Sequence, residues 1–307
     1  MAKIGIVQHA PVHLDLEQSM KKVMRLIREA VRKGAEMIFF GESWLTGYPA
    51  WLDYCPEVAL WDHKPTKTVY ARMYKNSITV PGNETDQLSG LARELNILVG
   101  LGLNEKTESG SGTIYNSLIM IDQKGHIVIH HRKLMPTFTE KILYGYGDGY
   151  GLKTYQSNFG KIGGLICWEH WMPHARQALH DSGELIHLAV WPTVHDIHQL
   201  ACRHYAFEGR CFVIAIGQIM KREDIPSEFA VPRRTGSGSD NYILRGGSCV
   251  IGPDGKYISE PIFDREEIFI VDINPDQAVG EKMTLDTAGH YYRPDIFKFR
   301  VNRTRIK

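Results

Sequence analysis

The fold class is decided by the stretch Lys161-Ile162-Gly163-Gly164-Leu165-Ile166-Cys167-Trp168-Glu169-His170-Trp171-Met172-Pro173. A short apolar run bounded by glycines predicts a buried strand. Pro173 is typical of the first turn of a helix, where its missing N–H is not needed. Cys167 is therefore expected between the carboxyl end of a strand and the amino end of a helix. Ligand sites of α/β proteins lie at such strand ends, and a helix dipole there favours a thiolate over a thiol.

Length and composition describe an ordinary globular chain. Its 307 residues suffice for one large domain or two ordinary ones, and 43% hydrophobic with 23% charged residues is typical of soluble proteins. The formal net charge of +1 gives no reason to expect nucleic acid or a membrane surface as a partner. No apolar run approaches the roughly 20 residues that a membrane span needs.

The cysteines indicate a reducing compartment. Five of them, an odd number without paired spacing, favour free thiols in a cytoplasmic protein. The amino terminus passes directly from Lys3 into the apolar run Ile4-Gly5-Ile6-Val7, which predicts a first strand rather than a signal peptide. We therefore expect a cytoplasmic localisation.

Strands and helices alternate along most of the chain. A capping box at Asp15 and Gln18 starts the first helix, which Gly34 ends. Further helices are predicted at 67–76, 86–96, 172–180 and 196–210, and strands at 3–9, 37–40, 98–103, 115–122, 127–131, 163–167, 185–190, 212–217, 247–251, 256–259 and 267–273. Residues 44–65 are predicted to form a loop. Later in the chain, the glycine–serine run at 236–239 is predicted to be a flexible part of another loop. This order favours one domain, built from a mixed sheet or two sheets flanked by helices.

Three segments each place a reactive group just after an apolar run, so they are expected to converge. They carry Glu42, Lys133 and Cys167. A free thiol has a pKa near ~8.5 and is mostly protonated at neutral pH. A neighbouring carboxylate can take its proton, and a lysine stabilises the negative charge that develops. Taken singly, these residues have simpler readings: a loop carboxylate, a solvated lysine and an inert core thiol.

These segments also resemble the motifs of a known family. The glutamate motif of the carbon–nitrogen hydrolase superfamily is matched by Gly41-Glu42-Ser43-Trp44-Leu45-Thr46-Gly47-Tyr48-Pro49, its lysine motif by His131-Arg132-Lys133-Leu134-Met135-Pro136-Thr137 with Glu140 following, and its nucleophile motif by Cys167-Trp168-Glu169-His170-Trp171-Met172-Pro173. The chain is thereby similar to the nitrilases, because Cys-Trp-Glu resembles the branch that acts on nitriles. His170 is a departure, since many nitrilases have asparagine there.

The resemblance implies a fold and an assembly. The fold would be an α/β, four-layer αββα sandwich that dimerises into an eight-layer arrangement. Residues 1–280 would form a single carbon–nitrogen hydrolase domain, and residues 281–307 a tail that packs on a partner subunit. A homodimer or a larger homo-oligomer is expected.

The resemblance also implies a mechanism. Cys167 would attack the nitrile carbon, and Glu42 would act as the base, giving a thioimidate and then a thioester before the acid and ammonia are released. Lys133 and the backbone N–H of Trp168 would stabilise the tetrahedral intermediates, and Glu140 would orient Lys133. No metal and no organic cofactor would be needed. The aromatic residues Tyr48, Trp168 and Trp191 are expected to bind the substrate, a small nitrile with an apolar organic group, although such residues also fill core volume.

Three other functions stay open on the sequence. An amidase of the same superfamily would take an amide instead of a nitrile. A non-catalytic assembly protein would keep the fold without the chemistry. A metal-dependent hydrolase would use some of the fourteen histidines, such as His195 and His198, although their spacing matches no strong metal motif.

Overall fold

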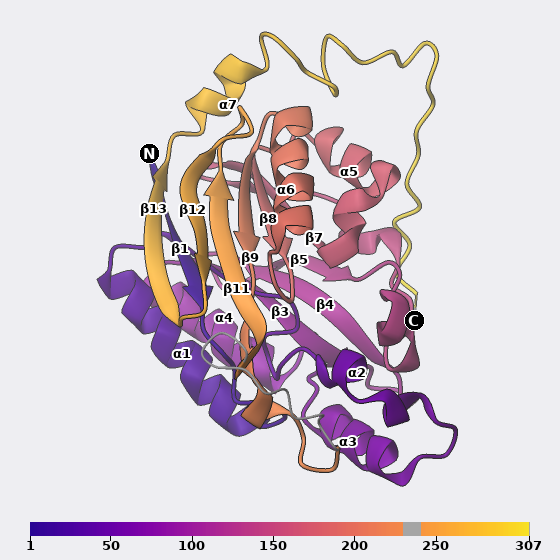
Figure 1. The fold of residues 1–307 in the computed structure, drawn as a ribbon. Helices are drawn as coiled ribbons and strands as arrows, with labels where there is room; N and C mark the ends of the chain where they lie inside the picture. Colours follow the sequence, from indigo (N-terminus) through magenta and orange to yellow (C-terminus); the bar gives the residue numbers. More distant parts are fainter. Residues whose placement is uncertain (230–240, 307) are drawn as a thin grey trace.

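The computed structural model describes residues 1–229 and 241–306, and its architecture is two β-sheets packed face to face between outer layers of helices (Figure 1). The strands are β1 (Ala2–Gln8), β2 (Met37–Phe40), β3 (Leu98–Lys106), β4 (Ile114–Ile121), β5 (Ile127–Arg132), β6 (Tyr155–Ser157), β7 (Gly160–Ile166), β8 (Ile186–Val190), β9 (Phe212–Ile216), β10 (Ile219–Lys221), β11 (Tyr242–Ile251), β12 (Tyr257–Phe263) and β13 (Glu267–Ile273). The main helices are α1 (Leu16–Arg32), α3 (Lys64–Lys75), α4 (Asn83–Leu95), α5 (Pro173–His180) and α6 (Asp196–Gly209).

The strands divide into two mixed sheets. The first has the order β13-β1-β2-β3-β4-β5, and the second the order β10-β11-β9-β8-β7-β6 with β12 paired to β11. Helices α1 and α4 cover the outer face of the first sheet, and α5 and α6 cover that of the second. The predicted four-layer αββα sandwich is therefore confirmed, whereas its dimerisation stays a prediction. The glycine–serine run at 236–239 lies outside the described residues.

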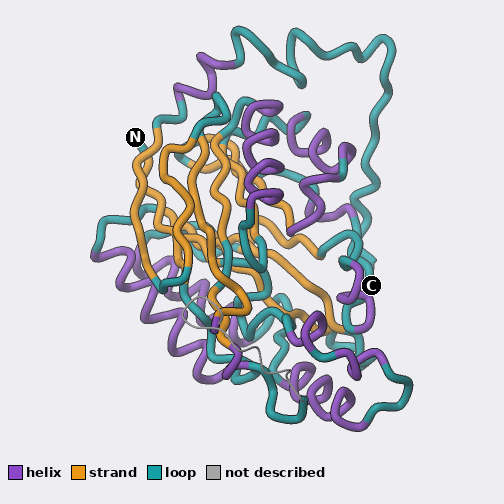
Figure 2. Tube along the Cα trace, in the orientation of Figure 1, coloured by secondary structure: helices purple, strands orange, loops and turns teal. Residues whose placement is uncertain are grey.

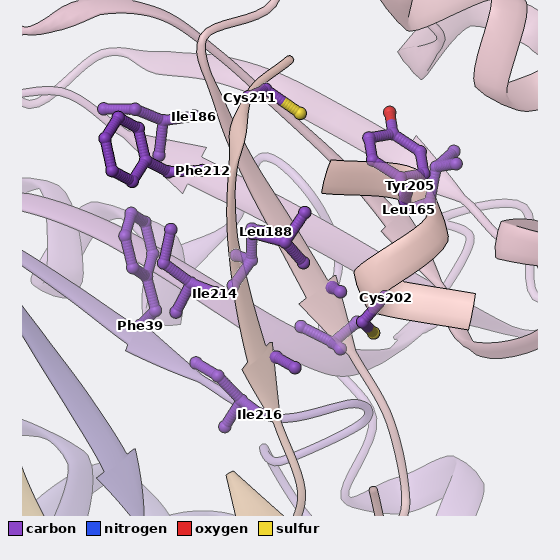
Figure 3. Close-up of a cluster of buried hydrophobic side chains, with 14 of the residues drawn as sticks. Phe39, Leu165, Ile186, Leu188, Cys202, Tyr205, Cys211, Phe212, Ile214 and Ile216 are labelled. Carbon is purple, nitrogen blue, oxygen red and sulfur yellow. The ribbon is translucent and has the colours of Figure 1, made fainter. Parts of the chain in front are cut away.

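The apolar run of β2 explains how one strand serves two cores. Side chains alternate across a sheet, so Met37 and Phe39 face the second sheet while Ile38 and Phe40 face the helices. All four are buried, as expected for a strand covered on both faces. Figure 3 shows Phe39 from this strand beside Ile214 of β9, in the core between the sheets.

The ends of α1 follow the sequence signals. The Asp15 side chain accepts a hydrogen bond from the backbone N–H of Gln18 at 3.0 Å, which satisfies a donor that the helix itself leaves free. Gly34 has a φ of 92°, a conformation that favours glycine after a helix. The prediction of a loop at 44–65 was incomplete, because α2 (Trp51–Tyr54) and a 3₁₀ turn (Pro56–Ala59) form there around the buried Trp51.

The tail after α7 (Asp276–Glu281) has no helix or strand in the described residues 282–306. It runs along one side of the molecule in Figures 1 and 2, and its end returns to its own chain. The Arg305 guanidinium pairs with the Asp148 carboxylate at 3.1 Å, and the N–H of Ile306 donates to Asp148 Oδ2 at 2.9 Å. Contact of the tail with a partner subunit stays a prediction. Among residues 1–229 and 241–306, no helix has the length and apolar character to cross a membrane.

Candidate active site

Glu42 is turned into the protein by a tight connection after β2. Ser43 has a φ of 48°, and the N–H of Leu45 donates to the carbonyl of Gly102 on β3 at 3.0 Å. A Cβ at Gly102 would lie 2.2 Å from the carbonyl oxygen of Gly41, so only glycine allows the two segments to approach this closely. The result is a fully buried carboxylate at the end of the first sheet.

Lys133 and Glu140 reach the same place from the segment that follows β5, an edge strand of that sheet. Lys133 directly follows β5, and its N–H donates to the carbonyl of Asn116 on β4 at 2.8 Å. Its ammonium Nζ lies 2.8 Å from Glu42 Oε1 and 2.7 Å from Glu140 Oε2. Glu140 is in a 3₁₀ turn (Phe138–Ile142) and also accepts from the N–H of Thr137 at 2.9 Å. One buried ammonium thus joins two buried carboxylates.

Cys167 completes the group from the second sheet. It follows the last residue of β7 and starts a 3₁₀ turn (Cys167–Trp171) with a φ of 54°. For a residue other than glycine this left-handed conformation costs about 1 kcal/mol or more, and such strain gathers at functional sites. Its sulfur and carboxylate oxygens of Glu42 and Glu140 all lie within 4.8 Å of one another. The structure therefore brings all four predicted catalytic residues together.

The sequence predicts a thiolate at Cys167 next to the amino end of a helix, but the surroundings of the thiol oppose ionisation. Helix α5 begins only at Pro173, beyond the turn that holds Cys167. Burial raises the pKa of Cys167 well above its usual range, Lys133 opposes this, and the charges of Glu42 and Glu140 raise it further. The surroundings of Cys167 thus oppose the expected thiolate, and the separate contribution of a helix dipole stays a prediction. At neutral pH the sulfur keeps its proton, so it needs a base.

Glu42 has the properties of that base. Burial raises its pKa to about 7, with Lys133 opposing and Glu140 adding to the rise, and a pKa near the working pH suits a general base. Its Oε1 accepts from Lys133 and, at 2.7 Å, from Nδ2 of Asn116. Its Oε2 has no hydrogen-bond partner among the described residues. One oxygen is therefore held in place while the other is free to take a proton.

Lys133 and Glu140 form the fixed part of the group. Burial acts to lower the pKa of Lys133, but electrostatic interactions with Cys167, Glu140 and Glu42 and the hydrogen bond to Glu140 outweigh it and raise the pKa well above its usual value. The ammonium is therefore charged. Both oxygens of Glu140 are engaged by Lys133, and Oε1 also accepts from the hydroxyl of Tyr48 at 2.7 Å. Tyr48 thus contacts the buried group of Glu42, Lys133 and Glu140 through Glu140 and also lines the cavity described next.

A cavity of about 420 Å³ opens above the sulfur. Its lining comprises Tyr48, Ala50, Asp53, Tyr54, Cys167, Pro192, Thr193, His195, His198, Ile243 and Leu244. Of the predicted substrate-binding residues, only Tyr48 is in this wall. The indole N–H of Trp168 donates to the carbonyl of Met135 at 2.6 Å. Trp191 is fully buried and packs behind the wall, with its ring centroid 4.6 Å from that of His198.

The sequence of the whole chain agrees with this geometry. The family model for carbon-nitrogen hydrolases matches residues 3–280. The chain belongs to the carbon–nitrogen hydrolase family. The predicted resemblance is thus confirmed, and with it the class of enzyme.

Relatives of this carbon–nitrogen hydrolase are similar over nearly its full length. It is 36% identical to "Nitrilase 2" from an unknown prokaryotic organism, across 98% of this chain and 92% of the relative. It is 34% identical to an aliphatic nitrilase of Sinorhizobium fredii, across 98% and 95% of the two chains. The crystal structure of a carbon-nitrogen hydrolase from Helicobacter pylori superimposes with a TM-score of 0.68, covering 96% of each chain at 19% identity, which supports the fold.

Two residues of the site were given no role from the sequence, although Glu169 stands in the nucleophile motif. Asn116 on β4 holds Glu42, and Glu169 joins the Lys133 and Cys167 segments. The Glu169 carboxylate accepts from the N–H of Leu134 and of Ile166, each at 2.7 Å, and lies 2.9 Å from Nε2 of His131. For Asn116 the available signal was a polar residue inside a predicted buried strand, because a buried polar group needs a partner.

The geometry of the site also bears on the hypothesis of a metal-dependent hydrolase. Within the described ranges, Glu42, Glu140 and Cys167 form the only group of three or more side chains that could hold a metal ion. The Lys133 ammonium already pairs with both carboxylates, so it supplies the positive charge that a metal ion would bring to them. His195 and His198 contribute to no such group.

Proposed function

We propose that this carbon–nitrogen hydrolase converts an organic nitrile into the carboxylic acid and ammonia. The observation that carries the proposal is the position of Glu42. Its Oε2 has no hydrogen-bond partner among the described residues, and one of its carboxylate oxygens lies within 4.8 Å of the Cys167 sulfur. A protonated nucleophile and a base of pKa about 7 are then neighbours. The relatives named nitrilase, at 36% and 34% identity, support a nitrile as the substrate.

The reaction follows from these groups. Glu42 takes the thiol proton while the sulfur attacks the nitrile carbon, and it passes that proton to nitrogen, giving a thioimidate. Water adds, ammonia leaves, and a thioester remains; a second water, activated by Glu42, releases the acid and the free thiol. Lys133 and the backbone N–H of Trp168 stabilise the negative charge of the tetrahedral states. Glu140 fixes the Lys133 ammonium. Every proton moves through Glu42, so these steps use no metal and no organic cofactor.

The cavity supports a compact substrate. Its volume of about 420 Å³ is in the range of small-molecule pockets. Ile243, Leu244 and the ring of Tyr48 give it apolar walls, and Asp53, His195 and His198 add polar groups. We therefore propose a small nitrile whose organic group is mainly apolar.

Product analysis tests the proposal. The purified protein is incubated with aliphatic, aromatic and arylacetonitriles and with the matching amides, and acid, amide and ammonia are measured. Acid and ammonia from a nitrile, lost in Cys167→Ala, are expected. Turnover of amides alone would refute the nitrile reading in favour of an amidase. Full activity of Cys167→Ala would refute cysteine catalysis, and loss of activity with a chelator would favour a metal.

We further propose a homodimer in a reducing, cytoplasmic compartment. The exposed side chains of Ile197 and Leu200 on α6, at 61% and 67% exposure, are expected to contact a partner subunit, and the tail from residue 281 to contribute to the same assembly. All five cysteines are free and buried, as suits a protein without disulfides. Light scattering of the parent and of Ile197→Glu tests the dimer; an unchanged mass in the variant would contradict this contact.

A further inference from the structure

A chain of buried polar side chains runs from the nucleophile away from the substrate cavity. Nδ1 of His170 lies 2.6 Å from the carbonyl oxygen of Cys167, and its Nε2 lies 2.9 Å from Nε2 of His187. Nδ1 of His187 lies 2.9 Å from Glu184 Oε1, and the hydroxyl of Tyr205 donates to Glu184 Oε2 at 2.7 Å. The four side chains beyond Cys167 are at most 1% exposed. None of them takes part in the mechanism above.

Counting donors fixes the direction of this chain. A carbonyl oxygen only accepts, so Nδ1 of His170 donates to Cys167. Burial lowers the pKa of His170 and of His187 well below the usual value, so each ring is neutral and has one N–H. His187 must then donate from Nε2, and its Nδ1 accepts from Glu184. Glu184 is therefore a protonated acid, in accord with a pKa that burial raises to about 8 against the opposing bond from Tyr205.

Ring packing holds the chain in place. The His170 ring stacks on Trp191 with centroids 4.8 Å apart, and the His187 ring stacks on Tyr205 at 3.8 Å. Figure 3 shows Tyr205 of α6 and Leu165 of β7, the strand that leads to Cys167, in the same cluster of buried side chains. The two imidazoles therefore have little freedom to rotate, and a fully satisfied buried network is rigid.

The bond to the Cys167 carbonyl acts on the next residue through the peptide plane. The carbonyl of Cys167 and the N–H of Trp168 belong to one planar trans peptide, so they point in opposite directions. That N–H hydrogen-bonds to the Cys167 sulfur; burial raises the pKa of the thiol, and this bond lowers it. A hydrogen bond at the carbonyl end also polarises the peptide and strengthens its N–H as a donor.

We propose that His170, held by His187 and Glu184, is a positioning residue that fixes the Cys167–Trp168 peptide and so aims the Trp168 N–H at the reacting centre. The inference rests on the proposed function, in which that N–H stabilises the tetrahedral states. The hydrogen bond from His170 also explains how Cys167 keeps its left-handed backbone conformation, because it holds the Cys167 carbonyl in place.

Paired substitutions separate this role from simple packing. His170→Leu removes the donor, whereas His170→Asn keeps an amide N–H near the place of Nδ1. Glu184→Leu breaks the chain, whereas Glu184→Gln still donates to His187 and accepts from Tyr205. Leu188→Ala, in the same core but outside the chain, is the control for lost stability. The measurements are kcat and KM with a nitrile, the melting temperature, and the rate at which iodoacetamide alkylates the protein.

We expect His170→Leu to lower kcat about 10- to 100-fold, part of the loss seen when an oxyanion donor is removed, with KM nearly unchanged and slower alkylation of Cys167. His170→Asn and Glu184→Gln should recover most of kcat, and Glu184→Leu should not. The inference is overturned if His170→Leu keeps the parental kcat, or if kcat follows melting temperature alike in all variants, Leu188→Ala included. Failure of the proposed function would differ, because the parent itself would then release no acid, or Cys167→Ala would stay active.

Discussion

Replacing Asn116 by leucine should move the pH dependence of catalysis. Asn116 donates to Oε1 of Glu42 at 2.7 Å, and this bond favours the ionised carboxylate. Burial, the largest influence, already raises the pKa of Glu42 to about 7. In the proposed mechanism the ionised form is the active base, so kcat/KM of the parent should fall as the pH drops through about 7. Without the amide, the pKa rises and the fall begins at higher pH.

The size of the shift follows from the bond that is lost. A hydrogen bond to a charged group contributes about 1.5–3 kcal/mol, and Lys133 stays on the same oxygen to offset part of the loss. Since one pH unit corresponds to about 1.4 kcal/mol, the acidic limb should move up by about one unit. The ionised fraction of Glu42 at pH 7 then falls from about one half to about one tenth. We expect kcat/KM to drop about fivefold at pH 7 and hardly at pH 9.

The assay measures kcat/KM for a nitrile from pH 5 to 9, with ammonia release as the readout. Ser117→Ala is the matched control, because Ser117 is the next residue on β4 and its hydroxyl donates to Glu105 instead of Glu42. Its acidic limb should stay near that of the parent. If Asn116→Leu lowers the plateau at every pH and leaves the limb in place, Glu42 is not the group that titrates.

Three further substitutions test the supports of the site. Lys133→Met leaves two buried carboxylates without their counter-charge, so urea unfolding should show a loss of about 3–5 kcal/mol and kcat should fall at least ~100-fold. Glu169→Ala leaves two backbone N–H groups without an acceptor, at about 1–3 kcal/mol each. Burial raises the pKa of Glu169, but His131 and these two N–H groups outweigh burial and hold the pKa below its usual value of 4.5. The loss of stability should therefore be largest above about pH 4.5 and should shrink as the pH falls through the lower pKa of the folded state. Gly102→Ala, whose Cβ would lie 2.2 Å from the Gly41 carbonyl, should lower the melting temperature and kcat together, whereas Gly90→Ala, with open space around it, should do neither.

Local sequence signals were enough for most of the fold. The capping box at Asp15 and the apolar runs that became β2 and β7 specify their elements through short-range chemistry, and the structure has them within a few residues of the predicted bounds. The pairing of strands into two sheets came from the resemblance. The short helix α2 was missed because its Trp51 side chain packs on Phe229, far along the chain, with ring centroids 5.0 Å apart.

The site was predicted unevenly for a related reason. Glu42, Lys133 and Cys167 stand in motifs, and their meeting at the strand ends could be foreseen. The environment of the thiol could not, because its pKa depends on burial and on two carboxylates from distant segments. His187 and Glu184 also escaped notice, although a histidine inside the apolar strand Ile186–Val190 is a signal that a buried partner must exist.

The charge of the buried group explains why Glu42 is poised near neutrality. Glu42, Glu140 and Lys133 are each at most 1% exposed, and two carboxylates against one ammonium leave a net negative charge. Burying an uncompensated charge is unfavourable, so the group favours one additional proton. Glu140 has both oxygens engaged by Lys133, Tyr48 and the N–H of Thr137, whereas Oε2 of Glu42 has no partner among the described residues. The proton therefore belongs on Glu42, and the same imbalance that makes burial unfavourable accounts for a pKa raised to about 7, which suits the proposed role of Glu42 as the base.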